Sequence, residues 1–363
     1  MARGDAIYHR KDGLWEARYV KEVDTFGRKK YGSVYGHSYR EARDKRQDAL
    51  DRILLYHKST PIRKISVSEL AKEWLYVNKN RLKLSSYQRY EGFLKNHIEK
   101  QIGNAGVVYL NTININEFAN ERLKTGLAPQ SVNAILIFLH SILKYGHQQY
   151  NFPLPDILYL SSPKKEMRVL TKEEQKKLVK FLTEKMDIYK LGVLVSLYTG
   201  IRVGELCALK WENMTNDSIK IRETMQRLQK ADGKGTTLHI GPPKTETSIR
   251  TIPVPSFLSP YIEQFREERK DQMFFLGKDE KGIIEPRTMQ YKFKAFLEEA
   301  GIEKANYHAL RHTFATRCIE LGFEVKSLSE ILGHSSVSTT LGKYVHASYE
   351  LKKTNMEKLS LPL

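Results

Sequence analysis

The sequence predicts a mainly α-helical chain with small β elements, an α+β protein built from several domains. Apolar residues recur at helical spacing through residues 66–150, and most of the chain after residue 168 follows helical patterns too. Short β-prone runs separated by turns occupy residues 6–37 and 218–253. A length of 363 residues is enough for two or three domains, and 40% hydrophobic residues are enough for packed cores. A disordered polybasic chain is therefore excluded.

The charge of the chain indicates a polyanionic partner. Lys and Arg number 60 against 42 Asp and Glu, which gives a formal charge of +18 and a pI near 9.6. The excess is positive in residues 1–65, 66–163 and 164–363 alike, as expected if several domains together surround one nucleic acid. A charge that only keeps the protein in solution is the alternative.

Hydropathy and cysteine content favour a cytoplasmic protein with no membrane partner. The sequence has no apolar run of about 18 residues, and Met1–Asp5 opens without a signal-peptide core. Cys207 and Cys318 are the only cysteines, so we expect reduced core thiols rather than a disulfide framework. Two thiols also cannot complete a four-ligand zinc site by themselves.

Three segments precede the C-terminal region. The sequence of residues 1–58 predicts a small three-stranded sheet with one helix. We expect strands at residues 15–20 and 31–35, and a helix that Ser38 caps and that runs to about His57. Its Arg, Lys and Tyr content suits strands that insert into a DNA groove, although a merely solvated basic fold is the alternative.

A linker at 59–65 is followed by a predicted all-α domain, residues 66–150. Its helices are expected at 67–78, 84–100, 114–123 and 128–150. A proline-containing linker covers 151–168.

The first candidate for chemistry is Thr199-Gly200-Ile201-Arg202-Val203-Gly204-Glu205-Leu206. An apolar helix ends near Gly200, and Arg202 stands at the entry to the next helix, beside main-chain N–H groups that favour an anion such as phosphate. Glu205, three residues on, lies on the same helical face and can hold the guanidinium group in place. A surface Arg–Glu pair would give the same pattern.

Two further segments carry histidines, an arginine and a tyrosine. His308 and Arg311, three residues apart, share one helical face, and an imidazole beside a fixed cation suits phosphoryl transfer. Gly333 is placed to end a helix, which leaves His334 at a helix junction with Tyr344 ten residues downstream. Chance spacing and ordinary packing are the alternatives for these residues.

Lys244 is the remaining candidate. It follows Pro242-Pro243 in a turn between two β-prone runs, from which its amine can reach into a cleft as a proton donor. It can equally be one of the many solvated lysines of the chain.

Taken together, these motifs resemble those of the tyrosine recombinases, also called phage-type integrases, of temperate phages and conjugative transposons. The matching strings are Thr-Gly-Ile-Arg-Val-Gly-Glu-Leu (199–206), His-Ala-Leu-Arg-His-Thr-Phe-Ala-Thr (308–316) and Leu-Gly-His-Ser-Ser (332–336), followed by Tyr344. One departure is Gly342-Lys343 just before Tyr344, where family members more often carry non-glycine residues. The resemblance implies an arm-site-binding domain at 1–58, a core-site-binding domain at 66–150, a catalytic domain at 169–347 with a small sheet, and a tail at 348–363 that packs on a neighbouring subunit.

The resemblance also implies a role for each candidate. Tyr344 would attack a phosphodiester and form a 3′-phosphotyrosyl bond, while Arg202 and Arg311 neutralise the developing charge without a metal ion or other cofactor. Lys244 would protonate the leaving 5′-oxygen, and His308 would accept the proton of Tyr344. His334 would hydrogen-bond the phosphate, and Glu205 would position Arg202. We place His312 and His346, which adjoin the motifs, outside the site.

The implied function is site-specific integration and excision of a prophage or conjugative transposon. The implied partners are double-stranded DNA with core and arm sites, a homotetramer on that DNA, a directionality factor and a DNA-bending host protein. Two rivals stay open, a type IB topoisomerase-like enzyme and a catalytically silent DNA-binding protein on the same fold.

Overall fold

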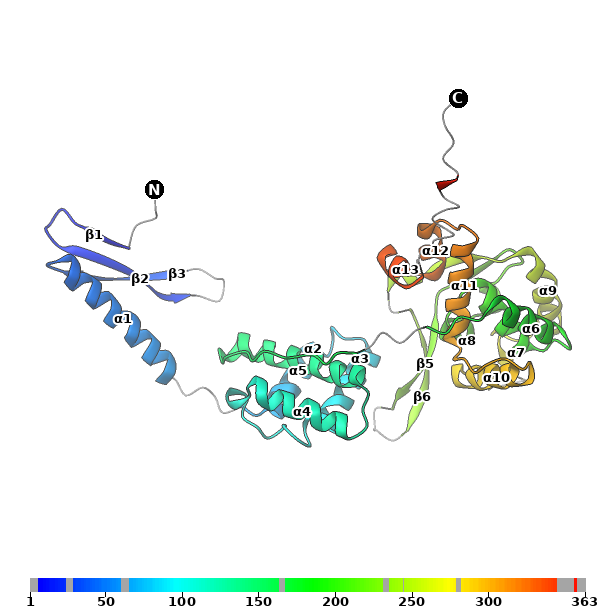
Figure 1. Cartoon of the computed structure of the whole chain (residues 1–363), viewed down its shortest axis with the longest axis horizontal. Coiled ribbons are helices and arrows are strands. Elements are labelled where there is room, and N and C mark those ends of the chain that lie inside the picture. Colours follow the sequence, from blue (N-terminus) through cyan, green and yellow to red (C-terminus); the bar gives the residue numbers. More distant parts are fainter. Residues whose placement is uncertain are drawn as a thin grey trace, which may run out of the picture. The chain divides into compact units, whose positions relative to one another are not determined.

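The computed structural model describes residues 6–23, 29–59, 65–162, 167–230, 235–243, 245–278, 282–344 and 356–357. The chain divides into two compact units, residues 1–162 and 163–363 (Figure 1). Most of the described residues are helical and the sheets are small, which confirms the predicted fold class. Within this described part of the chain, no helix combines the length and the apolar character needed to cross a membrane.

The N-terminal part of the first unit is a three-stranded antiparallel sheet covered by one helix. The strands are β1 (Ile7–His9), β2 (Trp15–Val23) and β3 (Lys29–Gly36), in the order β1-β2-β3, and the helix is α1 (Tyr39–Ser59). A small core of Ile7, Ala17 and Ala42 joins sheet and helix. Gly36 ends β3 where a Cβ atom would lie 2.6 Å from the main-chain nitrogen of Ala42, so a glycine permits the close approach.

The rest of this unit is a helical bundle with its own core. Its helices are α2 (Val67–Asn78), α3 (Leu84–Phe93), α4 (Thr112–Lys124) and α5 (Pro129–Tyr150). Ser66 and Glu69 form the capping box of α2, so the predicted start of this helix is confirmed. The helix predicted for 84–100 is α-helical only to Phe93 and continues as a π-helical turn, Leu94–Ile98. Apolar faces of these helices form one buried cluster that includes Leu70, Ile98 and Leu139.

Residues 152–160, which we predicted within a linker, pack on the helical bundle. Phe152 is fully buried in the bundle core. The side chain of Asn133 on α5 accepts a hydrogen bond from the main-chain N–H of Leu160 at 2.8 Å and donates one to its carbonyl oxygen at 2.9 Å. Prolines therefore mark the end of regular structure here, while the apolar residues between them still bury their side chains.

The described residues of the second unit are mostly helical, with three antiparallel strand pairs. Its main helices surround a central helix, α7 (Ile188–Thr199), which contacts α6, α8, α9, α10 and α11 (Figure 1). These and the remaining helices are α6 (Lys172–Thr183), α8 (Val203–Cys207), α9 (Ser259–Glu268), α10 (Pro286–Glu299), α11 (His308–Glu320), α12 (Val325–Leu332) and α13 (Val337–Tyr344). Both cysteines are buried free thiols, as predicted.

The four longer strands of the second unit, β4 to β7, lie between α8 and α9 in the chain. Strand β4 (Ser218–Ile221) pairs with β7 (Arg250–Pro253), and β5 (Thr224–Gln229) pairs with β6 (Thr236–Gly241). A minor pair, β8 (Gly277–Lys278) and β9 (Gly282–Ile283), precedes α10. Strand β5 contacts α8, and β7 contacts α12. One strand pair therefore contacts the helix that begins after Arg202, and the other contacts the helix that ends before His334.

Candidate active site

Arg202 is positioned by a turn that the sequence requires to be sharp. Helix α7 ends at Thr199, and Gly200 follows in the left-handed conformation with φ of +64°. A Cβ atom at Gly200 would lie 2.5 Å from the ring of Phe314, so this position also needs glycine for space. The chain then enters α8 with Arg202 as its N-cap residue. Arg202 thus stands where the sequence analysis placed it, between two helices and beside the helix start.

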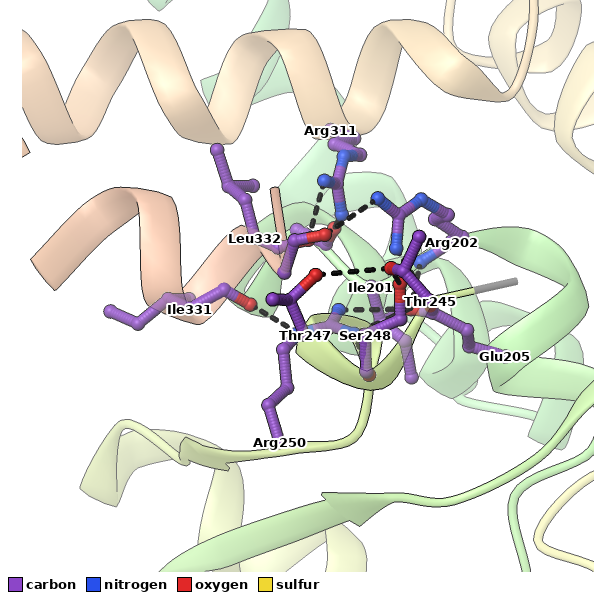
Figure 2. A network of polar contacts seen from close by, with 12 residues as sticks. Ile201, Arg202, Glu205, Thr245, Thr247, Ser248, Arg250, Arg311, Ile331 and Leu332 are labelled. Atoms are coloured by element: carbon purple, nitrogen blue, oxygen red, sulfur yellow. Dashed lines mark hydrogen bonds and ion pairs between the residues drawn. The ribbon is translucent and has the colours of Figure 1, made fainter. Parts of the chain in front are cut away.

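Glu205 is the centre of a buried ion-pair network (Figure 2). It is 2% exposed, and its Oε1 lies 2.6 Å from Nη1 of Arg202. Its other neighbour is Arg250 on β7, whose Nη2 donates to Oε2 at 2.9 Å and whose Nη1 donates to Oε1 at 3.2 Å. Burial raises the pKa of Glu205, but Arg250 and Arg202 outweigh that effect and hold its pKa below the usual range. Glu205 is therefore a fixed anion that orients two guanidinium groups.

Arg311 is a buried arginine held by main-chain oxygens. It is 2% exposed on α11; Nη1 donates to the carbonyl of Gly200 at 2.8 Å and Nη2 to that of Leu332 at 2.6 Å. Burial, together with the neighbouring Arg202, lowers the pKa of Arg311 to about 9. The group is still cationic at neutral pH, and a cation held by neutral acceptors at low dielectric attracts an anion strongly. Figure 2 shows the side chains of Arg202 and Arg311 converging from different elements.

His334 lies at a helix junction that the arginines help to build. Helix α12 ends at Leu332, and Gly333 has φ of +63°, as predicted for a helix-ending glycine. The carbonyl of Gly333 accepts a hydrogen bond from Nη2 of Arg202 at 3.2 Å. Nδ1 of His334 lies 2.8 Å from Oγ1 of Thr340, the buried threonine of α13. This contact fixes the imidazole against the helix that ends at Tyr344.

Tyr344 is buried at the end of α13, with 7% of its surface exposed. Its hydroxyl oxygen lies 3.0 Å from Nδ1 of His312 on α11, and its ring is parallel to that of His334 with centroids 6.3 Å apart. Burial raises the pKa of Tyr344, while the positive charges of Arg311 and Arg202 lower it and only partly offset the burial. The phenol is therefore protonated at neutral pH and lies in the field of both guanidinium groups.

One open pocket of about 400 Å³ brings together residues from every predicted motif. Of the six predicted catalytic residues, five line it: Arg202, His308, Arg311, His334 and Tyr344. The predicted supporting residue Glu205 lines it too. Lys244, the sixth, lies outside the described residues, as does His346; Pro243 and Thr245, which flank Lys244 in the sequence, line the pocket.

Two residues of the site were missed by sequence reasoning. His312, which the sequence analysis leaves outside the site, lies with its Nδ1 atom 3.0 Å from the hydroxyl oxygen of Tyr344. Its position four residues after His308 was the available signal, since residues i and i+4 share a helical face. Arg250 appeared only as part of a β-prone run. Nothing local marks an arginine on a strand as the partner of a glutamate 45 residues earlier.

Comparisons with known proteins bear on the family and the fold of this chain. Residues 168–350 match the phage integrase family, and residues 66–123 match the SAM-like N-terminal domain of phage integrases. A tyrosine recombinase XerC-like protein of Caldanaerobacter subterraneus is 27% identical over 94% of this chain and 96% of its own length. The ICEBs1 integrase of Bacillus subtilis is 25% identical over 75% of this chain and 77% of its own length.

Solved structures show the same fold. The Tn1549 transposon integrase in complex with circular intermediate DNA superposes with a TM-score of 0.69 at 22% identity, over 82% of this chain and all of that one. A λ integrase tetramer bound to a Holliday junction gives 0.56 at 18% identity, over 92% and 94% of the two chains. The chain belongs to the phage integrase family and is a tyrosine site-specific recombinase.

Proposed function

We propose that this chain cuts and rejoins DNA through a covalent bond between Tyr344 and a 3′-phosphate, and thereby integrates and excises a mobile element. The observation that carries the proposal is the shared pocket of Tyr344, Arg202 and Arg311, which come from three separate parts of the sequence. A phenol beside two fixed guanidinium groups suits attack on a phosphodiester, whose charge rises on the non-bridging oxygens.

The two arginines would hold those oxygens. Arg311 is fixed by the carbonyls of Gly200 and Leu332, and Arg202 by Glu205 and the carbonyl of Gly333. Both side chains are oriented before DNA arrives, so little reorganisation is needed in the transition state. Guanidinium groups can bind phosphate through two parallel hydrogen bonds, which places the phosphorus as well as neutralising it. His334 would add a hydrogen bond to the same phosphate.

The remaining steps are proton transfers. The P–O5′ bond breaks as the Tyr344 oxygen bonds to phosphorus, and Lys244 would protonate the leaving 5′-oxygen. A histidine of α11 would take the tyrosine proton; His308, which lines the pocket, was our prediction from the sequence. The new phosphotyrosyl bond is close in energy to the bond it replaces, so the 5′-hydroxyl of a partner strand can attack it and reseal the DNA without a high-energy cofactor.

The names of the relatives support an integrating element as the biological setting. The relatives include an ICEBs1 integrase and a Tn554 transposase, and we propose that this chain serves a prophage or conjugative transposon. Its proposed partners are core and arm sites on double-stranded DNA, three further copies of the chain, a directionality factor and a DNA-bending host protein. We place this activity at the nucleoid of a bacterial cytoplasm.

The proposed tetramer can be tested through the C-terminal tail. Residues 348–363, which fall almost entirely outside the described residues, would pack on a neighbouring subunit and couple the active sites. Truncation after Ser348 should then reduce synapsis and recombination while cleavage of a single core site continues. Unchanged synapsis and recombination would refute a role of the tail between subunits.

The test of the proposed function is covalent capture on nicked core-site DNA. Wild-type protein should form an SDS-resistant complex, and Tyr344→Phe should bind the same DNA but form none. Failure of the wild type to form the complex would favour a silent DNA-binding protein. Joining of two distinct sites separates a recombinase from a topoisomerase-like enzyme, because relaxation of supercoiled DNA is open to both.

A further inference from the structure

The proposed nucleophile, Tyr344, is in direct contact with His312, a histidine to which the sequence motifs assign no role. Nδ1 of His312 lies 3.0 Å from the hydroxyl oxygen of Tyr344, and the two residues are 8% and 7% exposed. The contact joins α11 to α13, so it sets the position of the phenol relative to the helix that carries Arg311. It is a tertiary hydrogen bond between the reacting oxygen and an imidazole.

A second imidazole connects this pair with solvent. His308 precedes His312 by one helical turn, and their rings meet edge to face with centroids 4.5 Å apart. His308 is exposed and lines the pocket, while His312 is buried. The three side chains of Tyr344, His312 and His308 therefore form a line from a buried phenol to the surface, and imidazoles are the side chains best suited to move protons near neutral pH.

The groups around the Tyr344 hydroxyl make a proton acceptor necessary there. Arg202 and Arg311 face the phenol from α8 and α11, and His334 stacks on it from the junction before α13. Burial keeps the phenol protonated in spite of those cations, so attack on phosphorus must remove its proton. When the hydroxyl donates, Nδ1 of a neutral His312 is the acceptor, and the distance is already that of a hydrogen bond.

We propose that His312 is the catalytic residue that accepts the proton of Tyr344, and that His308 exchanges this proton with solvent. The inference rests on the proposed function. As the Tyr344 oxygen bonds to phosphorus, its O–H bond breaks and the proton moves to Nδ1 of His312. The P–O5′ bond breaks, and the leaving oxygen takes a separate proton, for which Lys244 is the proposed donor. In the reverse direction, the attacking 5′-hydroxyl gives its proton to Lys244, the Tyr344–phosphorus bond breaks, and His312 returns its proton to the phenol.

The test compares His312→Gln with wild type in single-turnover cleavage of a nicked core site. Glutamine can keep a hydrogen bond to the hydroxyl but cannot take up a proton at neutral pH. The rate should fall by about 10²-fold to 10⁴-fold, the usual contribution of a positioned base. It should also rise about tenfold per pH unit, because hydroxide then supplies the tyrosinate.

A sulfur atom in place of the bridging 5′-oxygen separates the base from the acid, because a thiolate leaves without protonation. This substrate should restore cleavage to Lys244→Ala but not to His312→Gln. The inference would be overturned if the sulfur-containing substrate restored the cleavage rate of His312→Gln, or if this variant cleaved the ordinary substrate at the wild-type rate. Glu299→Gln, a substitution at an exposed position at the end of α10, is the control and should cleave as wild type does.

Folding and the proposed function are monitored in the same experiment. Core-site binding and a thermal melt show whether His312→Gln is folded, and His312→Asn is the second variant if it is not. A covalent complex formed by the wild type upholds the proposed function whatever the variant does. If the wild type forms the complex and both folded variants form it equally fast, the inference fails alone.

Discussion

The arginines of the N-terminal sheet and those of the pocket differ in how they are held. On the sheet, Arg18 is 57% exposed in its side chain, donates to Glu16 at 3.1 Å and stacks over the ring of Tyr8 at 5.3 Å. In the pocket, Arg311 is buried and donates to two main-chain carbonyls. Water and salt screen the first kind of charge and hardly reach the second. The sheet is therefore suited to salt-dependent binding of DNA, and the pocket to stabilising charge that forms during a reaction.

The largest effect should come from separating these two regions. Deletion of residues 1–60 should abolish binding to arm-type DNA, because it removes the basic sheet, while covalent cleavage at the core site continues. Gel-shift assays on arm DNA and SDS-resistant complexes on core DNA measure the two activities. Loss of both together would refute the assignment of separate roles.

Among the arginine substitutions, Arg311→Ala should have the largest effect on chemistry. Removing one preorganised donor to a developing oxyanion typically costs about 10²-fold to 10³-fold in rate. The single-turnover cleavage rate should fall by that amount, with core-site affinity changed far less. Arg317→Lys is the matched control on the same helix, since Arg317 pairs with Glu320 and is not among the residues that line the pocket. Equal losses in the two variants would contradict a specific role for Arg311.

Arg250→Met should reduce cleavage by about tenfold to 100-fold, the range common for residues that orient a reactive group. It removes two hydrogen bonds to Glu205 and leaves that carboxylate buried with Arg202 alone. Removing one partner of a buried ion pair also costs about 3–5 kcal/mol of stability, which chemical denaturation would measure. Arg227→Met, which breaks a solvent-exposed ion pair with Glu285, should change stability little. Similar stability losses in both variants would show that burial of Arg250 does not matter.

The smallest effect is a pH dependence of stability at Glu205. Its pKa is lower in the folded protein than the ordinary value of 4.5, so its contribution to stability is fully present above pH 4.5 and is lost as the pH falls through the folded-state pKa. The difference in unfolding free energy between wild type and Glu205→Gln should therefore be largest near neutral pH and shrink below about pH 4.5. A difference that grows on acidification would contradict the direction of the shift. Glu299→Gln at an exposed site should alter stability little.

Most of the site was predictable because local signals mark it. Gly200 and Gly333 end helices with positive φ, and each is followed within two residues by a pocket residue, Arg202 or His334. The helical start at Ser66 was equally local, because both members of the capping box lie within four residues. Periodicity and turn chemistry act over such short distances, so a single sequence reveals them.

The features that the sequence did not predict depend on contacts between residues far apart in the chain. Arg250 on β7 meets Glu205 on α8 only through the tertiary packing of these elements, and His312 meets Tyr344 only because α11 packs on α13. A run of prolines predicted a linker after Tyr150, but Phe152 is buried in the helical bundle. In each case the partner lies on another element, and no local pattern specifies which element will pack there.

The most direct test of the central claim is mass spectrometry of the trapped protein–DNA adduct after protease and nuclease digestion. A nicked core-site substrate that cannot be resealed should leave a nucleotide attached through its 3′-phosphate to the peptide that contains Tyr344. Fragmentation should locate this attachment at the phenol oxygen. A nucleotide on any other residue, or cleaved DNA without an adduct, would contradict the account.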